Sequence, residues 1–278
     1  MSLSIAPRTA RENAPEVETA EPQAIGPLWL SVAVCLLFVS YAALSAMRHR
    51  FGPAPDYSQH AFLYSSQILG AWLLLGATLA TVYHRRAFLR ESLLTGGRPW
   101  RVEIARGVSV FLFFILAVAI IGGLFTVASG KLPALGGTPH LLQSTDHRLH
   151  VGHTLALQMA PHSVADLLAW IAVSLSAAVC EELIFRGYLL RQCIAGLRRL
   201  AFSPRASVVL SIVITALIFS AGHLYEGTGS ALAILFLAGT YAVAALRFGN
   251  LRAVIVAHFL QDFLFGLFFY LQHVSRAR

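Results

Sequence analysis

Residues 178–187 read AVCEELIFRG and lie at the end of an apolar run that begins near Val164. Two adjacent carboxylates and a guanidinium are unexpected in a segment this apolar. An ionisable group at membrane depth is costly unless it is paired or faces a wet cavity, and it is by default a functional hypothesis. We therefore interpret Glu181, Glu182 and Arg186 as the centre of a functional site. The alternative is a purely structural ion pair near the membrane surface.

The composition favours a membrane protein. The chain is 57% hydrophobic and 12% charged, whereas a soluble domain is about 25% charged. With 278 residues, it has room for about six to eight spans of about 20 residues each. The net charge of +8 comes from Arg residues in short loops between apolar runs. This pattern indicates membrane topology, so we expect the lipid bilayer as a partner and no nucleic acid.

Seven apolar stretches are long enough to form membrane helices. The expected spans are at about 27–46, 61–83, 104–128, 164–188, 206–223, 230–246 and 251–271. The predicted fold is therefore all-α, a polytopic transmembrane helical bundle of about seven spans, or eight if a weak segment also enters the membrane.

The rest of the chain divides around these spans. Residues 1–26 have few large apolar side chains, so we expect a disordered cytoplasmic tail. Residues 27–160 are expected to form accessory helices and an outer loop, which includes a short interfacial helix at about 141–159. Residues 161–278 would be the transmembrane core that carries the functional site, with a basic amphipathic segment at 191–199.

Lys and Arg residues divide unevenly between the two sides of this bundle. One set of loops carries 15 of them, and the other carries 6, namely Arg48, Arg50, Lys131, Arg148, Arg276 and Arg278. Cytoplasmic loops carry the excess of these residues. We therefore predict a multi-pass protein of the cell (plasma or inner) membrane with a cytoplasmic N-terminus. Seven spans would place the C-terminus outside, and an eighth would reverse that side.

The fourth expected helix carries two acids in different positions. Glu182 and Arg186 are four residues apart with the acid first, which is the favourable order for a helical ion pair. Glu181 points about 100° away around the same helix. One carboxylate can therefore be held by Arg186 while the other faces another group. Two acids in different environments are the usual source of one fixed charge and one tunable base.

Two further helices carry candidate site residues at the same spacing. Phe219 and His223 lie on the fifth expected span, and His258 and Asp262 lie on the seventh. A histidine with a carboxylate at this spacing suits a base with its orienting partner, or two metal ligands. Each pair alone could be structural. The three together predict a buried polar site in the second half of the bundle, with the first three helices mainly as its wall.

Read in order, Glu181-Glu182-x-x-x-Arg186, Phe219-x-x-x-His223 and His258-x-x-x-Asp262 resemble the CPBP (Abi) family. This family includes the type II CAAX prenyl endopeptidases, and the resemblance covers about 160–268. It implies an intramembrane endopeptidase that cleaves a membrane-associated protein or peptide.

The resemblance also implies roles for the motif residues. Glu181 would be the general base, helped by His223, while Glu182 and Arg186 would fix the geometry. Phe219 would support the site. The third motif would stabilise the oxyanion through His258 and position 262. Family members have been described both as metalloproteases and as metal-independent glutamate proteases.

Asp262 departs from the family form that has Asn at this position. Asn can donate a hydrogen bond to an oxyanion, whereas an ionised Asp only accepts. Asp262 could be protonated, it could orient His258 as the donor, or Gln261 could supply the amide. Alternatively, His223, His258 and a carboxylate such as Glu181 could bind zinc. We favour metal-free glutamate chemistry and expect no cofactor.

Two rival functions remain open. A non-catalytic binding or immunity protein of the same fold would tolerate Glu181→Gln without loss of function. A transporter or proton relay would show substrate flux and no cleavage. The sequence does not indicate the oligomeric state.

The expected topology leaves one geometric conflict. With a rise of about 1.5 Å per residue, Glu181 and His258 fall in the cytoplasmic half of the bundle. His223 falls nearer the outer end of its helix. A strong tilt, a fifth helix that begins below the membrane surface, or a broken helix would bring them together.

Overall fold

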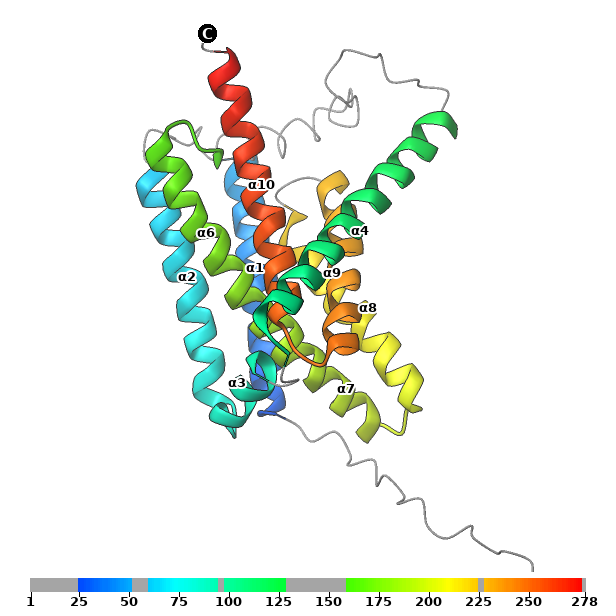
Figure 1. Ribbon diagram of the computed structural model, residues 1–278. Helices are drawn as coiled ribbons and strands as arrows, with labels where there is room; N and C mark the ends of the chain where they lie inside the picture. The colour runs from blue at the N-terminus through cyan, green and yellow to red at the C-terminus, as the bar shows by residue number, and fades with distance from the viewer. Residues whose placement is uncertain (1–24, 52–59, 95–97, 129–158, 225–227, 277–278) are drawn as a thin grey trace, which may run out of the picture.

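The computed structural model of the chain describes residues 25–51, 60–94, 98–128, 159–224 and 228–276. The expected tail and the expected interfacial helix at 141–159 lie outside these residues, apart from residues 25, 26 and 159. Figure 1 shows the described residues as a bundle of helices.

The described part of the chain is helical and contains no strand. Its elements in order are α1 (Leu28–Phe51), α2 (His60–Thr81), α3 (Arg85–Leu93), α4 (Trp100–Ala128), α6 (Val164–Glu182), the π-helix η3 (Leu183–Leu189), α7 (Leu190–Arg199), α8 (Pro204–Gly222), α9 (Thr228–Phe248) and α10 (Arg252–Arg276).

Six helices are long and apolar enough to cross a membrane. These candidate spans are His60–Thr81, Trp100–Leu124, Val164–Arg199, Pro204–Gly222, Ser230–Phe248 and Arg252–Ser275, and α1 adds the shorter apolar stretch Leu28–Ser40. The prediction of an all-helical membrane bundle with about seven spans is confirmed. The short helix α3 lies between the second and third expected spans and is an addition.

The outer surface of the bundle is apolar. On α4, for example, Phe113 is 58% exposed, Leu116 is 61% exposed and Leu124 is 66% exposed. A contiguous apolar exterior of this kind marks a surface that does not face water. The charged groups of the site lie inside the bundle, whereas a soluble protein keeps most of its charged side chains on its surface.

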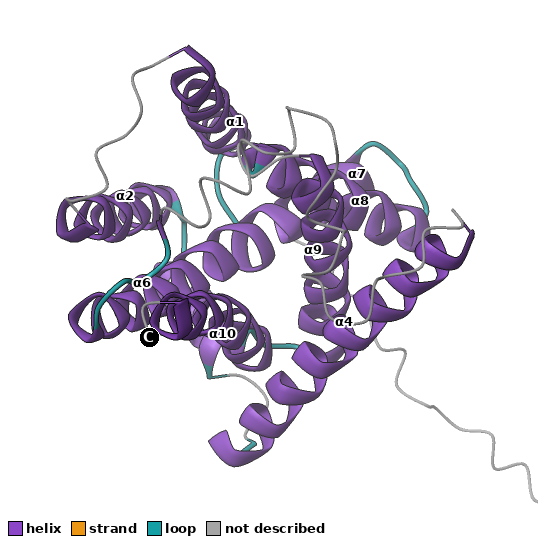
Figure 2. Ribbon diagram, turned by 90° about the horizontal axis from the view of Figure 1, so that it is seen from above, coloured by secondary structure: helices purple, strands orange, loops and turns teal. Residues whose placement is uncertain are grey.

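The second half of the chain forms the centre of the bundle. Helix α6 packs against both α2 and α10, and α10 also packs against α4. Figure 2 shows α6 and α10 between α2 on one side and α4 and α9 on the other. The crossing of α4 and α10 is close at Gly107, where an added Cβ would lie 2.6 Å from the carbonyl oxygen of Ala253. Only glycine fits this contact.

The helix that carries the first motif starts with a strong cap and then changes its winding. Ser163 caps α6, and Asp166 completes a capping box with it. We expected one α-helix through residue 188, but the α-helical part ends at Glu182 and a π-helix follows. π-helical turns occur mostly as short insertions, frequently at functional sites. The amphipathic segment expected at 191–199 corresponds to α7.

Candidate active site

Glu182 and Arg186 form a fully enclosed ion pair at the junction of α6 and η3. Nη1 of Arg186 donates to Oε1 of Glu182 at 2.8 Å, and the two side chains are 3% and 0% exposed, respectively. Nη2 of Arg186 donates to the carbonyl oxygen of Ala238 at 3.3 Å. Its guanidinium also lies 4.6 Å from the centroid of the Phe219 ring. A buried charge needs such a partner, although Oε2 of Glu182 is buried and makes no hydrogen bond to a described residue.

His258 of α10 joins this ion pair. Its Nδ1 lies 2.8 Å from Oε1 of Glu182, the oxygen that also accepts from Arg186. Its Nε2 lies 3.4 Å from Oδ2 of Asp262 and 3.8 Å from Oε2 of Glu181. The two ring nitrogens therefore face different carboxylates. The contact that orients the ring comes from Glu182, while Asp262 lies on the side of Nε2 with Glu181.

The two adjacent carboxylates are in different environments, as their positions on the helix predict. The side chain of Glu182 is 0% exposed, while that of Glu181 is 23% exposed. Only Glu182 pairs with Arg186. The fixed charge is thus Glu182, and the accessible carboxylate is Glu181.

His223 follows the last turn of α8 and is partly buried. Its Nδ1 lies 2.8 Å from the carbonyl oxygen of Phe219, and its ring centroid lies 4.7 Å from that of Phe219. It is also within electrostatic range of Glu181. The backbone of its own helix therefore holds the ring through Nδ1.

The structure resolves the conflict in height between His223 and the other two motifs. Figure 1 shows α7 running away from the foot of the bundle, with α8 rising back from its far end. This path brings the end of α8 to the level of η3, where the ring centroids of Phe219 and Phe185 are 4.8 Å apart. The low start of the fifth span, at the far end of α7, therefore accounts for the approach.

Phe219, Gln261 and Asp262 have distinct surroundings. Phe219 is 2% exposed and packs against Arg186, His223 and His258, so it supports these groups. The Asp262 side chain is 30% exposed. The backbone oxygen of Asp262 accepts from Trp170 at 3.0 Å, which ties α10 to α6. The side-chain oxygen of Gln261 is buried and makes no hydrogen bond to a described residue.

The sequence analysis missed two aromatic residues at this site. Tyr241 of α9 is 0% exposed. Its ring lies 5.9 Å from His258 and 5.6 Å from the guanidinium of Arg186. Phe38 of α1 lies 5.9 Å from His223. Tyr241 stands out as a tyrosine in an alanine-rich stretch, whereas no local signal distinguishes Phe38.

We also tested whether the described side chains could hold a metal ion. Among residues that the structure describes, no group of three or more His, Cys, Asp or Glu side chains is arranged to do so. His223, His258 and Glu181, the zinc ligands considered above, are among the described residues and do not form such a group. We therefore derive no step through a metal.

A comparison with known families gives a match over the part of the chain that carries the three motifs. Residues 163–264 match the family model described as Type II CAAX prenyl endopeptidase Rce1-like. Comparisons with curated proteins and with solved structures found no match. The family match supports an intramembrane CAAX-type endopeptidase function in general terms. The resemblance drawn from the motifs is confirmed: residues 163–264 match the Rce1-like family model, consistent with the CPBP family, in a chain whose described part has six long apolar candidate membrane spans.

Proposed function

We propose that this protein hydrolyses a peptide bond of a membrane-associated protein or peptide, with Glu181 as the base that activates a water. The observation that carries the proposal is the difference between the two adjacent carboxylates. Glu182 is enclosed with Arg186 and His258, while Glu181 is 23% exposed and faces Nε2 of His258. General bases need access to the reacting water, and a fixed partner does not.

In this proposal, Glu181 takes a proton from water as the oxygen attacks the scissile carbonyl. His223, whose Nδ1 lies against the carbonyl oxygen of Phe219, is within electrostatic range of Glu181 and assists this proton transfer. The proton held by Glu181 then passes to the leaving amine. The same carboxylate thus acts first as base and then as acid.

His258 is assigned the stabilisation of the oxyanion. In its imidazolium form, Nδ1 donates to Glu182 and Nε2 can donate to a developing negative charge. Donors fixed before the reaction are effective because they need no rearrangement as the charge develops. Asp262, at 3.4 Å from Nε2, would accept from that N–H and orient it before the reaction, and the oxyanion would replace Asp262 as acceptor as it forms. In this role Asp262 needs no donor of its own.

We propose that the chemistry is metal-free and that the protein acts in the cell membrane with its N-terminus in the cytoplasm. The first proposal rests on the arrangement of the described His and acidic side chains. The second rests on the excess of Arg in one set of loops. A zinc-dependent form of the same hydrolysis is the alternative, and a chelator separates the two.

The experiment is a cleavage assay in liposomes with a library of membrane-tethered peptides. His223→Ala and His258→Ala are compared with wild type, each with and without a strong chelator. His84→Ala serves as the matched control, because His84 is exposed and makes no cap hydrogen bond at the start of α3.

We expect both site variants to lose cleavage, the control to keep it, and the chelator to have no effect. Loss with chelator and recovery with zinc would overturn the metal-free mechanism. Full cleavage by both site variants would overturn the assigned roles.

A further inference from the structure

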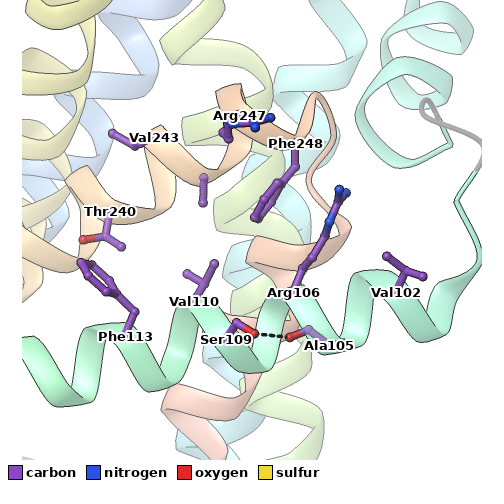
Figure 3. A pocket seen from close by; sticks show the side chains of 11 residues that line it. Val102, Ala105, Arg106, Ser109, Val110, Phe113, Thr240, Val243, Arg247 and Phe248 are labelled. Carbon is purple, nitrogen blue, oxygen red and sulfur yellow. Dashed lines mark hydrogen bonds between the residues drawn. The ribbon is translucent and has the colours of Figure 1, made fainter.

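A groove of about 460 Å³ lies between α4 and α9 (Figure 3). Its walls come from one face of each helix. On α4 they include Val110 and Phe113, and on α9 they include Val243 and Ala244. None of these residues belongs to the site described above.

The middle of the groove suits an apolar occupant. Two hydroxyl groups line it, those of Ser109 and Thr240. Ser109 donates to the carbonyl oxygen of Ala105 at 2.8 Å, and Thr240 donates to that of Phe236 at 2.9 Å. Because both hydroxyl groups donate within their own helix, the walls do not require a polar ligand.

One end of the groove is cationic. Arg106 and Arg247 both line it. Figure 3 shows them on either side of Phe248 at one end, with Phe113 and Thr240 at the other. Arg106 precedes Phe113 by seven residues and Arg247 follows Thr240 by seven. At about 1.5 Å per residue, both walls change from apolar to cationic after about 10 Å.

The local charges do not cancel at this end. Arg106 pairs with the buried Glu103 at 3.2 Å, and Nη2 of Arg252 lies 3.9 Å from the same carboxylate oxygen. Arg247 adds a further exposed cation. These four groups are three guanidinium ions and one carboxylate. The end of the groove therefore has an excess of positive charge.

This end also has the character of a membrane interface. Trp100, in the first turn of α4, is 55% exposed and lies 5.4 Å from the guanidinium of Arg252. Exposed Trp beside Arg is typical of the level of lipid headgroups. An apolar groove that ends in cations at this level has the shape and polarity of an acyl chain below a phosphate.

We propose that this groove binds an anionic phospholipid of the surrounding membrane. One acyl chain lies along Val110, Phe113 and Val243, and the headgroup phosphate accepts hydrogen bonds from Arg106 and Arg247. Arginine is well suited to phosphate because its planar fork donates two parallel hydrogen bonds. Basic pockets between membrane helices bind anionic headgroups by the same chemistry. The inference does not depend on the proposed proteolysis.

The test is native mass spectrometry of the purified full-length protein with phosphatidylglycerol and phosphatidylcholine of identical acyl chains. We expect phosphatidylglycerol to be retained in preference to phosphatidylcholine. Arg106→Gln and Arg247→Gln should each lower its apparent affinity about fivefold. Arg205→Gln, an exposed arginine at the start of α8, is the matched control and should change nothing.

Arg247→Gln keeps the test decisive even if Arg106→Gln destabilises the protein, because Arg247 is outside the Glu103 ion pair. Val243→Trp, which fills the groove, should lower the retention of phosphatidylglycerol while both arginines remain. Equal retention of the two lipids would overturn the proposal. So would an equal loss in Arg205→Gln, which would indicate general surface attraction. Full competition by inorganic phosphate, without effect of Val243→Trp, would also overturn it and indicate an anion site without an acyl chain.

Discussion

Oε1 of Glu182 lies 2.8 Å from Nδ1 of His258, although the two residues are 76 positions apart in the chain. The same oxygen accepts from Arg186. One buried carboxylate oxygen thus joins the first and third sequence motifs. The position of His258 depends on Glu182, so a substitution of Glu182 should also displace the His258 ring.

The two adjacent glutamates should respond differently to the same substitution. Glu181→Gln should lower cleavage by at least about 100-fold, the lower end of what a general base contributes, with little change in thermal stability. Glu182→Gln should lower both, because it leaves the buried Arg186 without its countercharge, at a cost of about 3–5 kcal/mol. Cleavage rates and thermal unfolding of the purified variants measure the two effects. Equal losses of stability would contradict the distinction between the two environments.

A double substitution tests the ion pair itself. Replacing a buried ion pair by apolar groups is often neutral, whereas removal of one partner is costly. We therefore expect Glu182→Met with Arg186→Met to unfold at a higher temperature than either single variant. Cleavage should stay low, because His258 has lost the carboxylate that orients it. Recovery of cleavage together with stability would show that the pair serves the fold alone.

Substitutions of Asp262 test whether this residue positions His258 or supplies a required negative charge. If Asp262 holds the Nε2 donor of His258, an amide oxygen can replace its carboxylate oxygen as acceptor. Asp262→Asn should then keep cleavage within about tenfold of wild type, a loss of at most about 1.4 kcal/mol in transition-state stabilisation. Asp262→Ala should lose more. The measurement is kcat/KM of wild type and the two variants on one peptide. If Asp262→Asn lowers kcat/KM as much as Asp262→Ala does, the negative charge is required.

Tyr241 tests the packing around the site. Its hydroxyl is buried and makes no hydrogen bond to a described residue, and an unpaired buried group costs about 1–3 kcal/mol. Tyr241→Phe should therefore leave the free energy of unfolding unchanged or raise it. Tyr241→Ala should lower it by about 3–5 kcal/mol, as for other large aromatic truncations in cores. A clear loss of stability in Tyr241→Phe would show that the hydroxyl has a partner.

Local spacing predicted some of these contacts and could not predict others. The pairing of Glu182 with Arg186 and the separation of Glu181 follow from helical geometry alone. The approach of His258 to Glu182 joins two distant helices, so it could be expected only from the resemblance to a family. The nearness of His223 to Glu181 depends on the path of α7 and α8, which the positions of apolar runs do not specify.

The residues that the sequence analysis missed share a physical reason. Phe38 and Tyr241 reach the site through packing between distant helices, and periodicity does not encode such contacts. The π-helix at Leu183–Leu189 has no proline that would mark a change of winding. Conversely, the apolar runs predicted the number and order of the long helices well, because membrane spans have a required length.

The most direct test of the central claim compares Glu181→Gln with Glu91→Gln in the liposome cleavage assay, with chelator present throughout. Glu91 is a suitable control because its side chain is 61% exposed and pairs with Arg191 at the surface. The account predicts that wild type and Glu91→Gln cleave a membrane-tethered peptide while Glu181→Gln does not. Cleavage by folded Glu181→Gln at the wild-type rate would contradict the assignment of Glu181 as the base.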